Sequence, residues 1–453
     1  MGPEAFTRPA LELKLYATSY CLSWLNRIKM KTKCLVIIAL VFIESVSGFS
    51  QINSLLPPEQ KLSLLKKACE EELINNILSW WSKVMPDEVN GGFYGRVDGN
   101  NTIIYGAPKG GILNARILWT YSSAYRMTKN PEYLRLATRA KDYILEHFID
   151  REYGGAYYSL NAEGEPLDTR KHTYTQAFFI YGLSEYARAT GDKVALTVAL
   201  EIFNLLEKHA FDTVAGGYFE AFSRDWSRLR DRMTGERTPA DEKTMNTSLH
   251  IMEAYANLYR IHPVKRLKEK VRSMVEVFLE KIIDKKTGHL ICFFDRSWNA
   301  TSKIDSYGHD IESSWLLYET AQLLNDRKLL EKVRATSIRI ADAAMEGITP
   351  EGAMLTEKNN ETGEVRTTRS WWEQAEAVVG YLNAYELTGN EKYINTAINA
   401  WNYINRYFVD RTNGGWYSNV TPEGTGRGDK AGHWICPYHN GRMCLEVMGR
   451  IKK

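Results

Sequence analysis

A short turn of glycine and aromatic or apolar residues recurs six times along the chain at nearly constant spacing. The last glycines of these turns are Gly92, Gly155, Gly217, Gly288, Gly352 and Gly415, which are separated by steps of 63, 62, 71, 64 and 63 residues. A fixed period of this length is the signature of a repeated structural unit. The fold is therefore expected to use one unit of about sixty residues six times.

The segments between the turns have the periodicity of helices. Residues 131–148 start with a proline and carry apolar residues on one stripe, which is typical of an outer, amphipathic helix. Four other segments are apolar on nearly all sides, as expected of more deeply buried helices: 178–189, 249–259, 311–324 and 375–387. Each unit is thus predicted to contain a hairpin, a buried helix and an outer helix.

Six such units predict an all-α fold, an (α/α)6 barrel with six inner and six outer helices and short β-hairpins at one end. An open solenoid of helical pairs is the alternative. The count of six and the lack of a polar capping repeat favour the closed ring. Because neither half would bury its inner helices alone, we interpret residues 55–453 as a single domain.

The N-terminal residues precede the repeat and have the pattern of a leader. Two lysines follow Met30, and then come a ten-residue apolar run at 34–43 and a small-x-small cleavage pattern at 45–47. These are the parts of a secretory signal peptide, and the run is too short to span a membrane. We interpret residues 1–29 as an over-extended N-terminus and 30–48 as the signal peptide. We expect export to the periplasm or medium if this leader is used, and a cytoplasmic protein otherwise.

Composition and motifs exclude several classes of function. The net charge of +3 is small for 453 residues and gives no reason to expect a nucleic-acid partner. The chain contains no HExxH, P-loop or GxGxxG motif, and its six cysteines lack metal-finger spacing. We therefore predict no cofactor and no metal. The 12 Trp and 26 Tyr suit the apolar faces of sugar rings.

Ionisable and aromatic residues collect where the inner helices are predicted to start. If these helices point the same way, the following residues meet at one end of the barrel: Arg116, Tyr174, Asn246, His250, His309, Glu312, Trp372, Glu376, Trp434 and His439. The last two belong to the stretch 433–442, whose proline and Asn-Gly pair predict a loop.

The residue types alone leave alternatives open. His309 and Glu312 fit a proton-transfer pair, because histidine titrates near neutral pH, but Asp310 and Glu312 also fit a helix start that complements the dipole. Arg116 in an apolar helix fits either a structural ion pair or an anionic ligand. Three histidines could converge on a metal, although no short-range ligand pair favours that.

Five stretches of the chain resemble one family of sugar epimerases. They are NARILWTYS (114–122), MNTSLHIMEAY (245–255), SYGHDIESSWLL (306–317), WWEQAEA (371–377) and CPYHNGR (436–442). The chain resembles the N-acylglucosamine 2-epimerase superfamily, and within it the cellobiose 2-epimerases, over about residues 55–450. The fold of that family is the (α/α)6 barrel, in agreement with the repeat. Family members usually lack a leader, and here the sequence departs from them.

The resemblance implies epimerisation at C2 of the reducing-end glucose in β-1,4-linked disaccharides such as cellobiose, and also mannobiose or lactose. His309 and His439 would exchange a proton with C2 through an enediolate. His250 would assist ring opening, Glu312 would orient or charge-couple His309, and Arg116 would stabilise the oxyanion. No metal or nicotinamide is required for such a reaction.

The resemblance also assigns the remaining residues to the substrate. Tyr174, Asn246 and Glu376 would bind sugar hydroxyls, and Trp372 and Trp434 would stack on the rings. The expected partner is the disaccharide substrate. Once the leader is cleaved, we expect no contact with a membrane. We expect a monomer or a weak homodimer.

Other functions remain alternatives on the same barrel. An N-acylglucosamine 2-epimerase or an aldose–ketose isomerase would share most of the site. A glycoside hydrolase would need two opposed carboxylates, for which the candidates are Asp310, Glu312, Glu373 and Glu376. A non-catalytic sugar-binding protein would need the aromatic residues but not the paired histidines.

Overall fold

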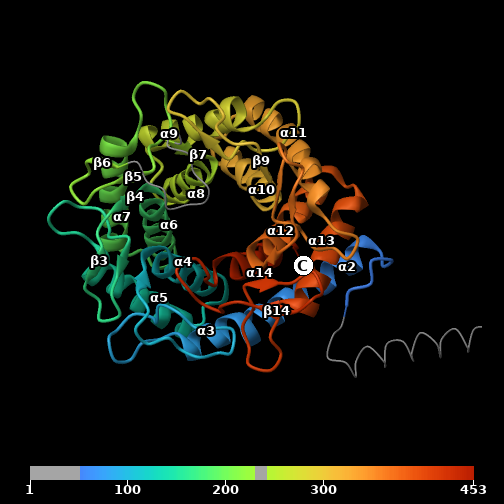
Figure 1. Ribbon diagram of the computed structural model, residues 1–453, viewed down its shortest axis with the longest axis horizontal. Coiled ribbons are helices and arrows are strands. Elements are labelled where there is room, and N and C mark those ends of the chain that lie inside the picture. The colour runs from blue at the N-terminus through green and yellow to red at the C-terminus, as the bar shows by residue number, and fades with distance from the viewer. Residues whose placement is uncertain (1–50, 230–241, 453) are drawn as a thin grey trace, which may run out of the picture. The chain divides into compact units, whose positions relative to one another are not determined.

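The computed structural model describes residues 51–229 and 242–452, and within these ranges Ile52 onward forms one compact unit (Figure 1). The predicted leader at 1–29 and 30–48 lies outside the described residues. None of the helices in the described ranges is long and apolar enough to cross a membrane.

Two concentric sets of helices form a ring (Figure 1). The inner set is α4 (Gly111–Thr128), α6 (Thr173–Thr190), α8 (Met245–Ile261), α10 (Tyr307–Leu323), α12 (Trp371–Thr388) and α14 (Tyr438–Arg450). The outer set is α2 (Pro58–Glu72), α5 (Pro131–Tyr143), α7 (Lys193–Leu205), α9 (Lys265–Val277), α11 (Arg327–Ala344) and α13 (Glu391–Tyr407). The prediction of an (α/α)6 barrel is confirmed. We number the six units by their inner helices, from α4 to α14.

Most outer helices change their winding toward the C-terminal end. The π-helical stretches η2 (Ile144–Phe148), η3 (Leu206–Ala210) and η4 (Phe278–Ile282) follow α5, α7 and α9. A 3-10 turn, η5 (Met345–Gly347), follows α11. The first outer helix continues through the π-helical η1 (Leu73–Leu78) into α3 (Ser79–Val84).

The two ends of the described chain close the ring. Helix α2 packs against α13 and α14, and α14 packs against both α12 and α4. Trp416 Nε1 donates to Glu72 Oε1 at 2.7 Å, and Gly415 N donates to Asn76 Oδ1 at 2.7 Å. The sixth unit is therefore completed by the first outer helix.

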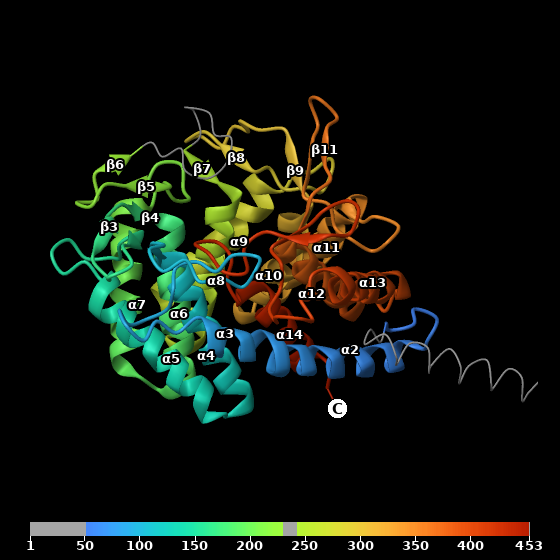
Figure 2. The same cartoon turned by 60° about the horizontal axis from the view of Figure 1, so that its bottom comes forward.

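Short strands lie at the end of the barrel where the inner helices begin (Figure 2). Five small antiparallel sheets are formed by β1–β3 (Lys109–Gly110, Ser159–Leu160, Pro166–Asp168), β4–β6 (Lys171–His172, Ala221–Phe222, Arg228–Leu229), β7–β8 (Lys243–Thr244, Phe293–Phe294), β9–β11 (Ile304–Ser306, Glu357–Asn359, Val365–Arg366) and β12–β14 (Arg369–Ser370, Asn419–Val420, Gly426–Arg427). In each sheet, the strand that enters an inner helix pairs with the hairpin of the next unit, so the sheets link neighbours around the ring.

The recurring glycine turns are tight and are closed by isolated β-bridges. The bridged residues after the turns are Phe93, Ala156, Tyr218, Leu290, Met354 and Trp416. The glycine pairs that precede four of them have positive φ, as Gly154 (72°) and Gly155 (71°) illustrate, which side chains with a Cβ rarely adopt. In the fourth and fifth units, His289 and Ala353 stand where the second glycine is found elsewhere.

A buried lysine–aspartate pair fastens most of these turns. The pairs are Lys109–Asp87 (2.9 Å), Lys171–Asp150 (2.8 Å), Lys243–Asp212 (3.0 Å) and Lys430–Asp410 (2.6 Å), and all eight side chains are almost fully buried. In the first three units, the lysine stands two residues before the inner helix. The fourth unit has Asp305 at that position, and the fifth has Arg369.

The last inner helix corrects one sequence-based prediction. Residues 433–442 were expected to form a loop, but α14 begins at Tyr438, so His439 lies in its first turn. Pro437 precedes that turn, where its missing N–H costs no hydrogen bond. A Cβ on Gly441 would lie 3.0 Å from Thr120 Cγ2, so this glycine allows α14 to approach α4 closely instead of forming a turn.

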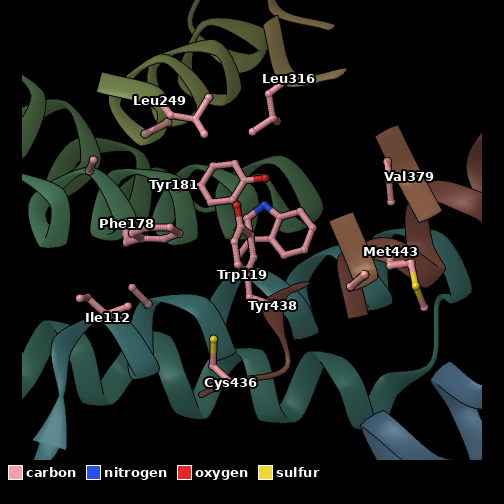
Figure 3. Close-up of a cluster of buried hydrophobic side chains, with 14 of the residues drawn as sticks. Ile112, Trp119, Phe178, Tyr181, Leu249, Leu316, Val379, Cys436, Tyr438 and Met443 are labelled. Carbon is pink, nitrogen blue, oxygen red and sulfur yellow. The ribbon is translucent and has the colours of Figure 1, made fainter. Parts of the chain in front are cut away.

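Aromatic side chains fill the centre of the barrel (Figure 3). Trp119 lies with its ring centroid 5.2 Å from Tyr181 and 5.4 Å from Tyr438, and these residues come from three different inner helices. The centre is thus a packed core that forms the base for the polar residues at the helix starts.

Candidate active site

A cavity of about 440 Å³ lies at the end of the barrel where the inner helices begin. Four of the predicted site residues line it: Tyr174, Asn246, His309 and Trp434. The cavity is also lined by Ser306, Cys292, Phe293, Glu357 and Arg366. Its volume is in the range of small-molecule sites.

Four of the other predicted residues share one level of the repeat. Arg116, His250, Glu312 and Glu376 are each the sixth residue of their inner helix, and the corresponding residue of α6 is Phe178. Helix α14 is shorter than the other inner helices, and its second residue, His439, lies within contact of Glu312 and Glu376. The repeat therefore brings these side chains from different helices together.

His309 lies in the first turn of α10, half-buried at the cavity. Its Nδ1 is 2.7 Å from Ser306 Oγ, and its ring centroid is 4.7 Å from that of Trp372. Burial and the neighbouring His250 lower the pKa of His309 to about 3, so the imidazole is neutral near pH 7. No residue in the described ranges hydrogen-bonds its Nε2.

His439 also contacts the indole of Trp372. Its ring centroid is 5.5 Å from that of Trp372, and its Nδ1 is 2.7 Å from Glu376 Oε1. Because Oε1 also accepts from Arg442, the imidazole Nδ1 is the donor in this contact. Burial, together with the charges of Arg116 and Arg442, lowers the pKa of His439 well below its usual value.

His250 belongs to a second histidine–carboxylate pair. Its Nδ1 is 2.9 Å from Glu253 Oε2, and the same oxygen accepts from Tyr438 Oη at 2.7 Å. The ring packs against Tyr174, with centroids 5.0 Å apart. Burial lowers the pKa of His250, although the hydrogen bond to Glu253 opposes this effect.

Arg442 connects three buried carboxylates, which we call the carboxylate cluster: Glu253, Glu312 and Glu376. Its Nη2 donates to Glu312 Oε1 at 2.5 Å and to Glu376 Oε1 at 2.6 Å, and its Nη1 donates to Glu253. Every side chain in this network is at most 4% exposed. One guanidinium therefore binds three acids that come from three different helices.

This network gives two glutamates contacts other than those expected of them. Glu312 was expected to orient or charge-couple His309, and in the structure it bonds Arg442, with its Oε1 4.0 Å from His439 Nδ1. Glu376 was expected to bind sugar hydroxyls, and in the structure its oxygens accept from His439, Arg442 and Trp315. Both glutamates are buried, and neither lines the cavity.

The three acids of the cluster differ in charge state. Burial and the charge of Glu376 raise the pKa of Glu312 to about 8, because these two carboxylates share one Arg442 nitrogen. Burial would also raise the pKa of Glu253, but Arg442 and His250 overcome it and hold that pKa at about 2. Burial also raises the pKa of Glu376, but its two oxygens accept from His439, Arg442 and Trp315. Since Glu312 Oε2 makes no hydrogen bond, Glu312 is the acid of this pair that keeps a proton at neutral pH.

Arg116 is buried without a carboxylate partner in the described ranges. Its Nη2 donates to Tyr174 Oη at 2.7 Å, and its guanidinium carbon lies 4.2 Å from the Phe178 ring centroid. Its Nε makes no hydrogen bond. A buried cation in such surroundings can stabilise an anion that forms beside Tyr174.

The donor atoms of Glu312, Glu376 and His439 lie within 4.8 Å of one another, which is close enough to hold a metal ion. However, Arg442 Nη2 already bonds Oε1 of both glutamates. A divalent cation at this point would have to displace a guanidinium of the same charge sign. These three residues therefore fit the Arg442 guanidinium better than a metal ion.

Three functional residues were missed from the sequence, and a fourth, Glu253, was given no role although it lies three residues after His250 on the same helix face. Arg442 and Tyr438 flank His439 within CPYHNGR, and Ser306 lies three residues before His309. Their partners come from other units, which local spacing does not reveal.

Comparison with known proteins assigns the family. The model of the N-acylglucosamine 2-epimerase (GlcNAc 2-epimerase) family matches residues 92–440. The chain belongs to this family. The matched range contains every predicted site residue from Arg116 to His439.

Within the N-acylglucosamine 2-epimerase family, the chain is similar to proteins named cellobiose 2-epimerase. It is 47% identical to the one from Bacteroides fragilis over 85% of this chain and 99% of the relative, and 40% identical to one from Ruminococcus albus over 84% and 97%. The solved cellobiose 2-epimerase of Bacillus thermoamylovorans matches with a TM-score of 0.82 and 38% identity, over 86% of this chain and 100% of that one. The prediction that the chain is an epimerase is confirmed by these matches.

Proposed function

We propose that the protein inverts C2 of the reducing-end sugar in β-1,4-linked disaccharides, converting cellobiose into glucosyl-mannose, with mannobiose or lactose as further substrates. The observation that carries the proposal is a pair of imidazoles from different helices, His309 and His439, in contact with one indole, Trp372. Each has its Nδ1 engaged by the protein, which leaves Nε2 for the sugar. The names of the similar proteins support the substrate class.

The reaction needs a base on one face of C2 and an acid on the other. In the open-chain sugar, the C2 proton is acidic because it lies next to the aldehyde carbonyl. One imidazole removes this proton, the electron pair moves toward the C1 oxygen, and an enediolate forms. The other imidazole then returns a proton to the opposite face of C2, which inverts its configuration without net oxidation or reduction.

The surroundings of the two histidines favour different starting charges. His309 contacts only the neutral Ser306 hydroxyl through Nδ1, which suits a neutral base. Burial and the two arginines lower the pKa of His439, but its hydrogen bond to the Glu376 carboxylate opposes them by stabilising an imidazolium, which suits the acid. In the reverse reaction the two residues exchange these roles.

Arg116 stabilises the negative charge that develops on oxygen, since its cation has no carboxylate to neutralise it. His250 assists ring opening by taking a proton from the anomeric hydroxyl, and Glu253 supports the resulting imidazolium. Tyr174 and Asn246 line the cavity, and the buried Asn246 Oδ1 makes no protein hydrogen bond, so it can accept from a sugar hydroxyl. Trp434, 36% exposed, offers its ring to the second sugar.

A glycoside hydrolase is less well supported by the same site. An inverting hydrolase needs two carboxyl groups on opposite sides of the scissile bond. Among the described residues that line the cavity, Glu357 is the single carboxylate, and it pairs with Arg366 at 3.0 Å. The carboxylate cluster does not line the cavity, and its three acids are paired with Arg442.

Incubation of the purified protein with cellobiose in D₂O, followed by NMR, tests the proposal. We expect deuterium at C2 and a disaccharide that ends in mannose, and we expect no effect of EDTA. Free glucose would indicate hydrolysis, and no turnover would indicate a binding protein. His309→Ala and His439→Ala should each lower the rate by at least about 10²-fold, as expected for an acid or base. Near-wild-type turnover in either folded variant would reject the two-histidine mechanism.

A further inference from the structure

The fourth unit, which carries His309, differs from the other units at three neighbouring positions. Asp305 replaces the lysine found two residues before the inner helix in the first three units. His289 replaces the second glycine of the turn. Asp310 is the fourth residue of α10, where α6 and α12 have Gln176 and Gln374.

In the second and fifth units, a neutral amide fastens the inner helix to its own turn. Gln176 Oε1 accepts from Ala156 N at 2.8 Å, and its Nε2 donates to Ala156 O at 2.7 Å. Gln374 makes the same two bonds to Met354, both at 2.8 Å. Since Ala156 and Met354 are the bridged residues of their turns, each amide fixes a first helical turn to a rigid hairpin.

In the fourth unit, the pair of Asp310 and His289 replaces the glutamine amide. Asp310 Oδ1 accepts from Leu290 N at 2.8 Å, where Leu290 is again the bridged residue. A carboxylate cannot donate to the Leu290 carbonyl, and its second oxygen instead lies 2.7 Å from His289 Nδ1. Both side chains are buried, with exposures of 0% and 3%.

Other acids surround the imidazole of His289. Its Nε2 lies 3.8 Å from Asp305 and 3.7 Å from Glu346, while Tyr307 packs against the ring with a centroid distance of 6.0 Å. Burial opposes a charged ring, but Asp310 and these acids outweigh it and raise the pKa of His289. These acids therefore favour a positive charge on His289, which lies between Asp310 on one side and Asp305 and Glu346 on the other.

His309 depends on this attachment more than the other site histidines do. His250 and His439 are each bonded to a buried glutamate, whereas His309 Nδ1 contacts Ser306 in the strand that leads into the same helix. Asp310 is the next residue, and it contacts the hairpin, while His309 lines the cavity. The position of the His309 ring is thus set by the first turn of α10.

We propose that Asp310, held by His289 and Leu290, is a positioning residue that fixes the first turn of α10 and so places His309 for proton transfer. This inference rests on the proposed function. A misplacement of about 1 Å in a reacting group can cost about 10²-fold in rate.

The test compares kcat and KM for cellobiose in three variants. Asp310→Ala removes both bonds and should lower kcat by about 10²-fold, with KM within about threefold of wild type. Asp310→Asn retains an oxygen for Leu290 N and offers an N–H to His289 Nδ1, so it should recover kcat to within about tenfold. Gln176→Ala removes the corresponding attachment in α6, and we expect a similar loss in melting temperature but less than about a threefold loss in kcat.

Three results would overturn the inference while leaving the proposed function intact. They are wild-type kcat in folded Asp310→Ala, a loss confined to KM, and a loss in Asp310→Asn as large as that in Asp310→Ala. If Asp310→Ala does not fold, His289→Phe, which keeps a ring of similar size but loses the hydrogen bond, should lower kcat at least about tenfold. Unchanged kcat in that variant would equally reject the inference. A wild-type protein that incorporates no deuterium at C2 would reject the proposed function and this inference together.

Discussion

Arg442 holds Glu253, Glu312 and Glu376 at the base of the site, and a single positive charge cannot balance three ionised acids. Burial makes unpaired charges expensive, so protonation of one acid is the least costly solution. Glu312 is that acid, because it shares an Arg442 nitrogen with Glu376 and its Oε2 makes no hydrogen bond. The charge state of one side chain thus decides the net charge beneath His439.

The raised pKa of Glu312 predicts a pH-dependent stability. Because the folded-state pKa of about 8 lies above the ordinary value of 4.5, the folded protein holds a proton that the unfolded chain releases. This contribution is fully present below about pH 4.5 and is lost as the pH rises toward 8. Glu312→Gln imitates the protonated acid, so its free energy of unfolding, measured in urea at pH 5 and pH 8, should fall less than that of the wild type. An equal fall in both proteins would contradict the assignment.

The sequence predicted which residues belong to the site better than it predicted which side chains they contact. The positions of Arg116, His250 and His309 at helix starts were readable from the repeat, whereas His439 was expected in a loop. Helical spacing places Glu312 and His309 on one face, but it does not reveal that Arg442, 130 positions away, binds the Glu312 carboxylate. Long-range pairing of buried charges depends on how the helices pack, which spacing within one helix does not contain.

The first turns of the inner helices are the elements on which the site is built, and the hairpins hold them in place. A buried ion pair is costly to break, since removing one partner leaves an uncompensated charge. Lys109 illustrates this, with its Nζ bonded to Asp87 at 2.9 Å and to Gly91 O at 2.7 Å while only 1% exposed. The hairpin of the first unit therefore depends on one lysine.

We predict that Lys109→Met destabilises the protein by about 3–5 kcal/mol, because Asp87 remains buried without its cation. Chemical denaturation monitored by circular dichroism measures this change. Arg327→Met is the matched control: Arg327 pairs with Glu331 on the surface, 92% exposed, and its loss should not measurably change stability. Equal effects of the two substitutions would show that burial of the pair is unimportant.

Helix α14 shows why one element was predicted incorrectly. Pro437 and the Asn440-Gly441 pair are turn signals in isolation, and they outweighed the apolar pattern that follows. In the folded protein, Asn440 is 3% exposed and Gly441 packs against Thr120, so close packing of α14 on α4 determines the conformation. Tertiary contacts override local preference where a small residue is needed for helix approach.

The whole molecule is a ring whose six-fold character was readable from the spacing of the glycine turns. Six equal units indicated how many helices there are, and the apolar pattern indicated which set is inside. The closing contact was not readable, because it joins α2 to α14 across more than 350 residues. The Trp416–Glu72 bond, which joins α2 to the last glycine turn, likewise spans 344 residues. Such contacts carry no local signal.

Ring closure predicts that the barrel unfolds as one unit. Deletion of residues 52–84, which form α2 to α3, should abolish the cooperative transition in calorimetry, because it removes Leu65, Cys69, Leu73 and Ile77 from the core, all 0% exposed. The inner helices would then lose their packing neighbours one after another around the ring. A shortened protein that melts cooperatively near the wild-type temperature would contradict this prediction.

The joining of the first outer helix to the last inner helix also sets the order of events during synthesis. Domains emerge from the ribosome at about 5–20 residues per second, so roughly 20–75 s separate the appearance of α2 from that of α14. During this interval, α2 exposes the apolar face that α14 will cover, and His439 and Arg442 do not yet exist. Under the proposed mechanism, a nascent chain is therefore inactive until its last helix is made. Its first helix needs protection from aggregation until then.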